Sequence, residues 1–121
     1  MKKKILVIDD EELLTKTFVR LLEAKGYDVL VSKGAQDALI ILEEEKFDLI
    51  VTDVRMPGMN GVEAIEQLRA IGDQTPVIFL TGYADVDLER RARALSPEGY
   101  VQKPFEVVDL LKKINTFVLP Q

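Results

Sequence analysis

The chain has 121 residues, 47% of them apolar, which suits one compact domain with its own hydrophobic core. Sixteen Lys and Arg against twenty-one Asp and Glu give a net charge of −5, which argues against nonspecific binding to nucleic acid or anionic lipid. The sequence has no Cys and no His, which excludes disulfides, thiolate zinc sites and a phosphate-carrying histidine on this chain itself.

The amino-terminal stretch MKKKILVI begins with bases, as a signal peptide does. Its apolar run ends after four residues at Asp9, whereas a secretory signal needs about 7 to 15. No stretch approaches the roughly 18 to 20 apolar residues of a membrane span. We therefore expect a cytoplasmic protein that does not contact membranes.

The first part of the chain predicts two strands with a helix between them. Residues 5–8 form a fully apolar strand, and the helix that follows ends near Gly26, a residue type that commonly ends helices. Residues 27–31 alternate between apolar and polar, as in a strand at or near the edge of a sheet. The apolar stripe of the helix consists of Leu14, Phe18, Leu21 and Leu22.

The middle of the chain predicts two more helices and two more strands. Residues 47–52 form a strand that we place at the centre of the sheet, and Asp53 follows it. The turn VRMPGMNG leads into the third helix, and residues 76–81 form a fourth strand that ends in Thr81. The apolar positions are Ala38, Leu39, Ile41 and Leu42 in the second helix and Val62, Ile65 and Leu68 in the third.

The last part predicts a helix, a short strand and a final helix. The fourth helix has the weakest apolar stripe, so we expect it to pack lightly and to move most. Residues 99–102 form the fifth strand, which leads to Lys103, and the last helix runs from Phe105 to about Val118. Its broad apolar face is either core or a partner surface, and we expect core, with Leu110 and Phe117 as the test. The stripe of the fourth helix is Ala84, Leu88, Ala92 and Leu95.

Polar residues follow four of the five predicted strands. Asp9 and Asp10 come after the first strand, Asp53 after the third, Thr81 ends the fourth, and Lys103 comes after the fifth. This alternation of strands and helices is typical of an open, mainly parallel α/β sheet. Such sheets bind ligands beyond the carboxyl ends of their strands, so we expect these five residues to converge.

Three carboxylates in one place need compensating charge. Each pair repels by roughly 4 kcal/mol at about 4 Å and an effective dielectric constant near 20. Lys103 supplies one positive charge, and a ligand set of oxygen atoms suits Mg²⁺ as a second. A carboxylate beside Mg²⁺ and an ammonium, with a hydroxyl nearby, suits the acceptance of a phosphoryl group. We therefore predict that Asp53 is the nucleophile.

These motifs resemble the response-regulator receiver domain of two-component signalling, a chemotaxis-receiver-like family. The resemblance covers nearly the whole chain and implies a single receiver domain over residues 1–121. It implies a flavodoxin-like, doubly wound α/β fold, with a five-stranded parallel sheet of order 2-1-3-4-5 and five helices on both faces. Each motif is weak alone but specific in this order. The motifs are the pair Asp9 and Asp10, the loop DVRMPGMNG led by Asp53, Thr81 with Gly82, and KPF at residues 103–105.

The resemblance implies a phosphoacceptor signalling domain that catalyses at most its own phosphorylation and dephosphorylation. Asp53 then takes a phosphoryl group from a phosphohistidine on a sensor histidine kinase or a histidine phosphotransfer protein. Mg²⁺, with Mn²⁺ as a substitute, is expected to be bound by Asp10, Asp53 and the backbone carbonyl of Arg55, while Asp9 acts mostly through water. Arg55 and Tyr83 occupy positions that in the family shape hydrolysis of the acyl phosphate.

The same resemblance implies a switch. Lys103 is expected to pair with a phosphoryl oxygen, and the peptide bond before Pro104 is expected to be cis. Thr81 is expected to move toward the phosphoryl group while Tyr100 turns inward. The face made by the fourth helix, the fifth strand and the fifth helix then changes, and we expect it to form an isologous homodimer or to bind a partner.

Other functions remain open from the residues alone. A small Mg²⁺-dependent phosphohydrolase can also use an aspartyl nucleophile, although one such family has a second Asp where this chain has Arg55. A flavodoxin-like cofactor binder needs a phosphate loop rich in hydroxyls and glycine after the first strand, where this chain has four acids. A phosphorylation-independent binding scaffold of receiver type does not need the acids, Thr81 and Lys103 together.

The individual residues also have ordinary roles. The acids of DDEE can simply begin a helix, where they meet the positive end of its dipole, and we expect Glu11 and Glu12 to do only that. Tyr100 can be an ordinary half-buried aromatic residue of an edge strand.

Overall fold

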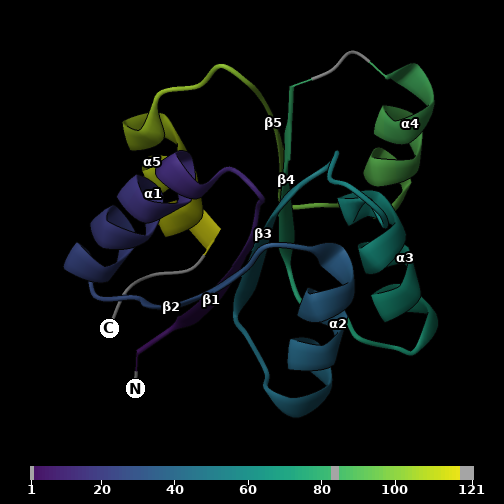
Figure 1. Ribbon diagram of the computed structural model, residues 1–121, viewed down its shortest axis with the longest axis horizontal. Coiled ribbons are helices and arrows are strands. Elements are labelled where there is room, and N and C mark those ends of the chain that lie inside the picture. Colours follow the sequence, from purple (N-terminus) through teal and green to yellow (C-terminus); the bar gives the residue numbers. More distant parts are fainter. Residues whose placement is uncertain (1, 83–84, 118–121) are drawn as a thin grey trace.

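One parallel sheet forms the centre of the molecule. The computed structural model describes residues 2–82 and 85–117, without the side chains of Leu13, Leu14 and Phe117. In this part of the chain, strands and helices alternate, and the strand order is β2-β1-β3-β4-β5, which confirms the predicted fold class (Figure 1). The elements are β1 (Lys4–Ile8), α1 (Glu12–Ala24), β2 (Asp28–Ser32), α2 (Ala35–Glu44), β3 (Leu49–Asp53), α3 (Gly61–Ala70), β4 (Val77–Thr81), α4 (Val86–Ala94), β5 (Gly99–Gln102) and α5 (Val107–Phe117).

The burial of each strand follows its place in the sheet. Every residue of β3 and of β4 is buried, because helices cover both faces of these central strands. The edge strand β2 alternates between exposed and more buried residues, and none of the four described residues of the other edge strand, β5, is fully buried. The central place predicted for the strand at residues 47–52 and the edge place predicted for that at residues 27–31 are therefore confirmed. The bounds differ, because β3 begins two residues later and includes Asp53, and β2 is shifted by one residue.

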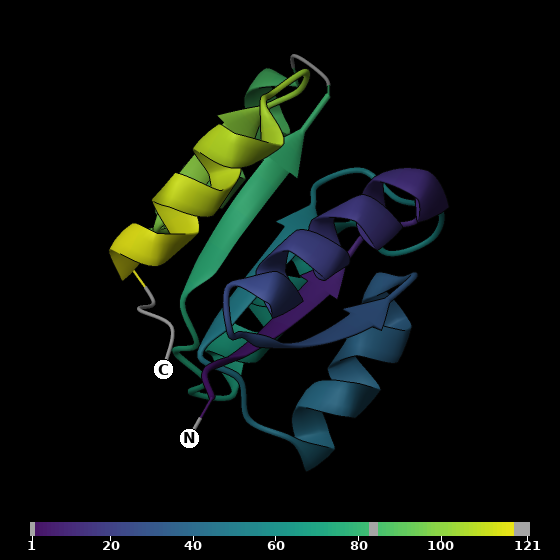
Figure 2. The same ribbon diagram turned by 90° about the vertical axis from the view of Figure 1, so that its left-hand side faces the viewer.

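The helices form two layers around the sheet. One face is covered by α2, α3 and α4 and the other by α1 and α5 (Figures 1 and 2). Successive strand residues point to opposite faces, so each strand contributes to two separate cores. The core under α2, α3 and α4 contains Leu6, Ile8, Ile50, Phe79, Val62, Ile65 and Leu68. The core under α1 and α5 contains Ile5, Val7, Val51, Ile78, Phe18, Leu22, Leu110 and Ile114.

The wide apolar face of α5 belongs mostly to the core, as expected. Leu110 is 2% exposed and Ile114 is fully buried, whereas Val108 is 58% exposed and faces away from the sheet. The helix begins at Val107, two residues later than predicted. The predicted end at Val118 and the side chain of Phe117 lie outside the described part of the chain.

The prediction for α1 was wrong at one position. Leu21 is 37% exposed, although it was expected in the buried stripe. The buried side chains of this helix, among those described, are Thr15, Phe18 and Leu22. At 100° per residue, Leu21 lies about 90° from the middle of that face, which is far enough to reach solvent. The side chain of Leu14 lies outside the described part of the chain.

The weak apolar stripe of α4 is also found in the structure. Among the described residues of this helix, Ala92 alone is fully buried, while Leu88 and Leu95 are half-buried against the core beneath α2, α3 and α4. Ala84, the first predicted position of the stripe, lies outside the described residues. The predicted mobility of the helix stays a prediction.

Candidate functional site

The predicted site residues come from the carboxyl ends of four strands and lie at the same end of the sheet. The strands are parallel, and their registers bring these ends to nearly the same height. Asp9 and Lys103 directly follow β1 and β5, while Asp53 and Thr81 are the last residues of β3 and β4. The register pairs that fix this arrangement are Ile8 with Thr52, Asp53 with Leu80, and Thr81 with Gln102.

Three carboxylates gather at this end of the sheet. One oxygen of Asp9, one of Asp10 and one of Asp53 all lie within 4.8 Å of one another. Asp9 and Asp53 are only 3% and 6% exposed, whereas Asp10 faces solvent. Asp9 is further oriented by the backbone N–H of Glu11, which donates to its Oδ1 at 2.9 Å. Two buried carboxylates and one exposed carboxylate make an oxygen-only ligand set that fits Mg²⁺.

The ammonium of Lys103 lies among these acids. Its Nζ is 3.2 Å from Asp53 Oδ2 and 3.8 Å from Asp9 Oδ2. Glu11 Oε1 is a third partner at 3.1 Å. The prediction that Glu11 merely begins α1 was therefore wrong, because its side chain turns back to the site. A sequence shows four consecutive acids but not which of them reaches across to a lysine 92 residues away.

Burial and charge shift the pKa values of these groups. Desolvation raises the pKa of Asp53 to about 6, although the nearby Lys103 ammonium opposes the shift. Desolvation likewise raises the pKa of Asp9. Burial disfavours the charged form of Lys103, but the carboxylates of Asp53, Glu11 and Asp9 outweigh it, and the pKa of Lys103 is raised. Lys103 therefore stays positively charged at neutral pH, while Asp53 holds a proton more tightly than an ordinary carboxyl group.

The loop after Asp53 is held tightly against the end of β3. The N–H of Gly61 donates to the carbonyl of Val54 at 2.9 Å, and a Cβ at Gly61 would collide with the Asp53 carbonyl and lie 2.8 Å from Thr52 Oγ1. Only glycine permits this close approach. Asn60 caps α3 reciprocally with Glu63. The turn predicted from the sequence thus fixes the backbone next to Asp53.

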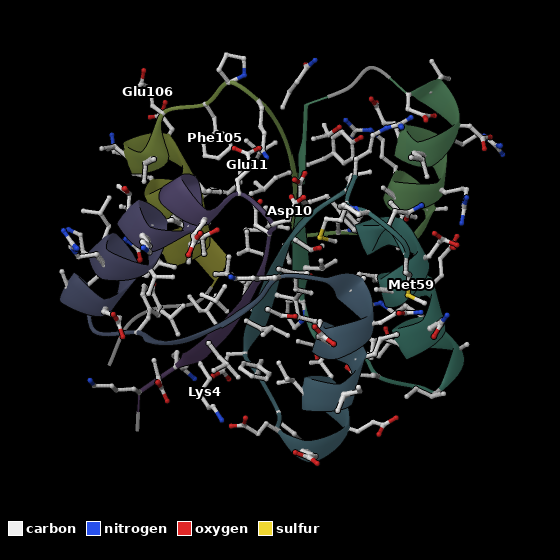
Figure 3. All side chains as sticks on the ribbon, viewed as in Figure 1. Lys4, Asp10, Glu11, Met59, Phe105 and Glu106 are labelled. Carbon is white, nitrogen blue, oxygen red and sulfur yellow. The ribbon has the colours of Figure 1, made fainter. Side chains whose placement is uncertain are left out.

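Thr81 and Lys103 are tied together through the backbone. The N–H of Lys103 donates to the Thr81 carbonyl at 2.6 Å, and the Lys103–Pro104 peptide bond is cis, as expected. Thr81 is 4% exposed at the end of β4. An open pocket of about 440 Å³ lies beside them, lined by Glu11, Gly82, Lys103, Pro104 and Phe105. Figure 3 labels Asp10, Glu11 and Phe105 at this end of the molecule.

Tyr100 lies on β5, below the acidic cluster. Its ring is half-buried, and its centroid is 6.4 Å from that of Phe79. The guanidinium carbon of Arg93 from α4 lies 4.8 Å from the centroid of the Tyr100 ring. Tyr100 therefore connects β5 with α4, but its role in a switch stays a prediction.

Arg55 extends from the same loop toward α4. Its Nη2 lies 2.6 Å from Oδ2 of Asp85, the residue that caps α4. The other carboxylate oxygen of Asp85 accepts the backbone N–H of Leu88 at 3.0 Å. These partners, the Leu88 N–H first and Arg55 after it, lower the pKa of Asp85. No pattern in the sequence indicates this ion pair, and Tyr83 lies outside the described residues.

The chain is similar to many known proteins of one family. The family model of the response regulator receiver domain matches residues 5–115. Alkaline phosphatase synthesis transcriptional regulatory protein PhoP of Bacillus subtilis is 39% identical over 118 residues, which are 98% of this chain and 49% of that protein. Sporulation initiation phosphotransferase F of the same organism is 25% identical over 118 residues, which are 98% of this chain and 95% of that protein.

The chain spans about half the length of PhoP and of several other curated relatives that it matches. Among solved structures, a receiver domain protein described as CheY-like, from Methanospirillum hungatei JF-1, has a TM-score of 0.90 and 30% identity. The match covers 96% of this chain and 93% of that one. Within the described residues, every helix is too short or too polar to cross a membrane.

Proposed function

Because the chain belongs to the response regulator receiver domain family of two-component systems, we propose that it is a phosphoacceptor whose Asp53 receives a phosphoryl group from a histidine of a partner protein. The observation that carries the proposal is the position of the Asp53 carboxylate. It is buried, 3.2 Å from the Lys103 ammonium and grouped with the carboxylates of Asp9 and Asp10. The domain is a module over residues 1–121, and the donor is a sensor histidine kinase or a histidine phosphotransfer protein.

The chemistry follows from these neighbours. An Asp53 carboxylate oxygen forms a bond to phosphorus while the bond from phosphorus to the donor imidazole nitrogen breaks, and the imidazole keeps the electron pair. The Lys103 ammonium stabilises negative charge on the phosphoryl oxygens, and the Thr81 hydroxyl donates a hydrogen bond to one of them. Phosphoryl transfer depends mainly on such positioning and charge neutralisation.

The acids need a cation to work at neutral pH. Asp10, Asp53 and the Arg55 carbonyl would bind Mg²⁺ or Mn²⁺, with Asp9 acting through water. The ion would neutralise the charge of the carboxylates and of the incoming phosphoryl group. These 121 residues contain no histidine, so the phosphohistidine that serves as the donor must lie outside them.

The signal then passes to the α4, β5 and α5 face. In this proposal Thr81 moves toward the phosphoryl group, Tyr100 leaves the guanidinium of Arg93, and the changed face pairs with a second copy or a partner. The module acts in the cytoplasm and contacts neither nucleic acid nor membrane itself. It catalyses at most its own phosphorylation and dephosphorylation.

Labelling by a small phosphodonor tests the proposal. The protein is incubated with acetyl phosphate and Mg²⁺, and its intact mass is measured. We expect one phosphoryl group per chain, removed by hydroxylamine as an acyl phosphate is, and none on Asp53→Asn. The exposed Asp37→Asn is the matched control and should be labelled like the wild type. Equal labelling of Asp53→Asn would contradict the assignment.

A second measurement separates the proposal from the phosphohydrolase alternative. The protein alone is given p-nitrophenyl phosphate with Mg²⁺, and release of nitrophenol is followed. A phosphoacceptor of this family should release little over many hours. Sustained turnover that Asp53→Asn abolishes would favour the hydrolase instead.

A further inference from the structure

The attachment of α4 to the rest of the domain is largely polar. Within its described residues, Ala92 alone is fully buried, so its apolar contacts are few. Among the described residues, two ion pairs join the helix and its N-cap to other elements: Arg55 with the N-cap residue Asp85, and Arg91 with Glu66 of α3 further along. The second pair is bidentate, at 3.1 and 2.6 Å. The position of α4 therefore depends on charge more than that of the other helices.

The first of these pairs links the start of α4 to the β3–α3 loop, which follows Asp53. Arg55 is two residues beyond Asp53, and its guanidinium lies 2.6 Å from the Asp85 carboxylate. That carboxylate uses one oxygen for the guanidinium and the other for the Leu88 N–H. Movement of the Arg55 guanidinium would therefore remove a contact of Asp85, the N-cap residue of α4.

A phosphoryl group on Asp53 would compete for this guanidinium. It adds about two negative charges two residues from Arg55. Arginine binds phosphate oxygens and carboxylates with similar geometry, so the same group can serve either. The side chains of Arg55 and Asp85 are 52% and 28% exposed, and an ion pair this accessible changes an equilibrium constant only about 1.5- to 5-fold. A contact of that strength favours the attached position of a helix but does not prevent its release.

We propose that Arg55 and Asp85 form an electrostatic latch that holds the first turn of α4 against the β3–α3 loop, and that a phosphoryl group on Asp53 opens it by drawing the Arg55 guanidinium away. The trigger rests on the proposed function, whereas the latch itself exists in the unphosphorylated protein. The Arg91–Glu66 pair keeps the later turns of α4 attached to α3, so opening frees mainly the first turn.

The main alternative is that Asp85 only caps α4. The substitution Asp85→Asn separates the two roles, because Asn caps a helix as well as Asp but carries no charge. The matched control is Asp87→Asn, which removes the same charge from the same first turn. Asp87 pairs with Arg90 of its own helix and not with Arg55. Any effect through the helix dipole should therefore be shared by both variants.

The experiment measures amide hydrogen exchange over residues 85–95. In the unphosphorylated protein, Asp85→Asn should speed exchange at the start of α4 about 1.5- to 5-fold, and Asp87→Asn should leave it near the wild-type rate. Arg55→Gln should have the same effect as Asp85→Asn, and the double variant should add nothing. At about 1 M salt the difference should shrink. Phosphorylation by acetyl phosphate should speed exchange in the wild type but change Asp85→Asn less.

Two failures can be told apart. If Asp85→Asn and Asp87→Asn exchange alike, or if the effects of Arg55→Gln and Asp85→Asn add, the latch does not exist, whatever happens at Asp53. If the wild type takes up no phosphoryl group, the proposed function fails and the latch loses its trigger. If phosphorylation occurs and leaves exchange at α4 unchanged, the trigger alone is wrong.

Discussion

The carboxylate of Glu11 lies 3.1 Å from the ammonium of Lys103, as close as the Asp53 carboxylate at 3.2 Å. The two acids differ in their surroundings, because the side chain of Glu11 is 58% exposed and that of Asp53 is 8% exposed. Water can replace Glu11 as a partner far more easily than it can replace Asp53. Glu11 thus holds the lysine from the solvent side of the site.

The exposure of Glu11 predicts a small effect of Glu11→Gln. Loss of the Glu11 charge should change the free energy of unfolding by less than about 1 kcal/mol, because solvent screens the ion pair between Glu11 and Lys103. It should also lower the pKa of Lys103 toward the ordinary value, since one of the groups that raises this pKa is removed. NMR titration of the lysine side chain measures the shift. Glu12→Gln is the control, and an equal shift there would contradict the contact.

Asp53 should make the metal-free protein less stable at neutral pH. Its pKa is about 6 in the folded protein against an ordinary value of 3.8, so the folded state binds the proton more tightly than the unfolded state. Stability therefore falls as the pH rises from about 4 to 6 and stays low above that. The difference amounts to about 3 kcal/mol at most.

The substitution Asp53→Asn tests this directly. In EDTA at pH 7 the variant should be more stable than the wild type by on the order of 2 kcal/mol, and near pH 4 the two should be alike. Urea unfolding at several pH values measures the difference. Mg²⁺ should reduce the difference in stability between the variant and the wild type, because the ion binds and stabilises the folded wild type. Asp37→Asn should show no such pH-dependent gain, and a less stable Asp53→Asn at pH 7 would refute the prediction.

The strands and the gathering of the site were predictable because few rules govern them. Uniformly apolar runs indicate central strands, and parallel strands bring their carboxyl ends together, so Asp9, Asp53 and Lys103 had to meet. The order of the strands in the sheet could not be predicted in this way, because periodicity does not determine it. Only the family resemblance implied it. Contacts made by long, exposed side chains could not be predicted, because the partner of Glu11 or Arg55 depends on rotamers and on loops that periodicity does not describe.

Removal of Asp10 should weaken metal binding without loss of the fold. Asp10 is the exposed member of the three carboxylates, so Asp10→Ala leaves both hydrophobic cores intact. Affinity for Mg²⁺ depends on the number of charged ligands, and we expect a decrease of at least about tenfold. Isothermal titration calorimetry measures it. Glu12→Gln removes a nearby charge outside the cluster, and an unchanged dissociation constant for Asp10→Ala would show that Asp10 is not a ligand.

Gly61 should tolerate no side chain. In Gly61→Ala the new methyl group would collide with the Asp53 carbonyl, and we expect a loss of about 1 to 3 kcal/mol of stability, measured by urea unfolding. Gly34→Ala is the control, since no atom lies within 4 Å of a Cβ there, and it should cost less than about 1 kcal/mol. Equal losses of stability in the two variants would mean that the close approach at Gly61 does not contribute to the free energy of unfolding.

Because Gly61 lies so close to the carbonyl of Asp53, the α3 side of the site has less room for movement than the α4 side. On the α3 side the backbone has no clearance, and the helix that begins there is anchored by buried Val62 and Ile65. The proposed phosphoryl group on Asp53 would therefore lie next to a fixed backbone on the α3 side, whereas α4 has a single fully buried side chain among its described residues. If Asp53 accepts a phosphoryl group as proposed, we expect the resulting displacement on the α4 side, where fewer buried side chains oppose it.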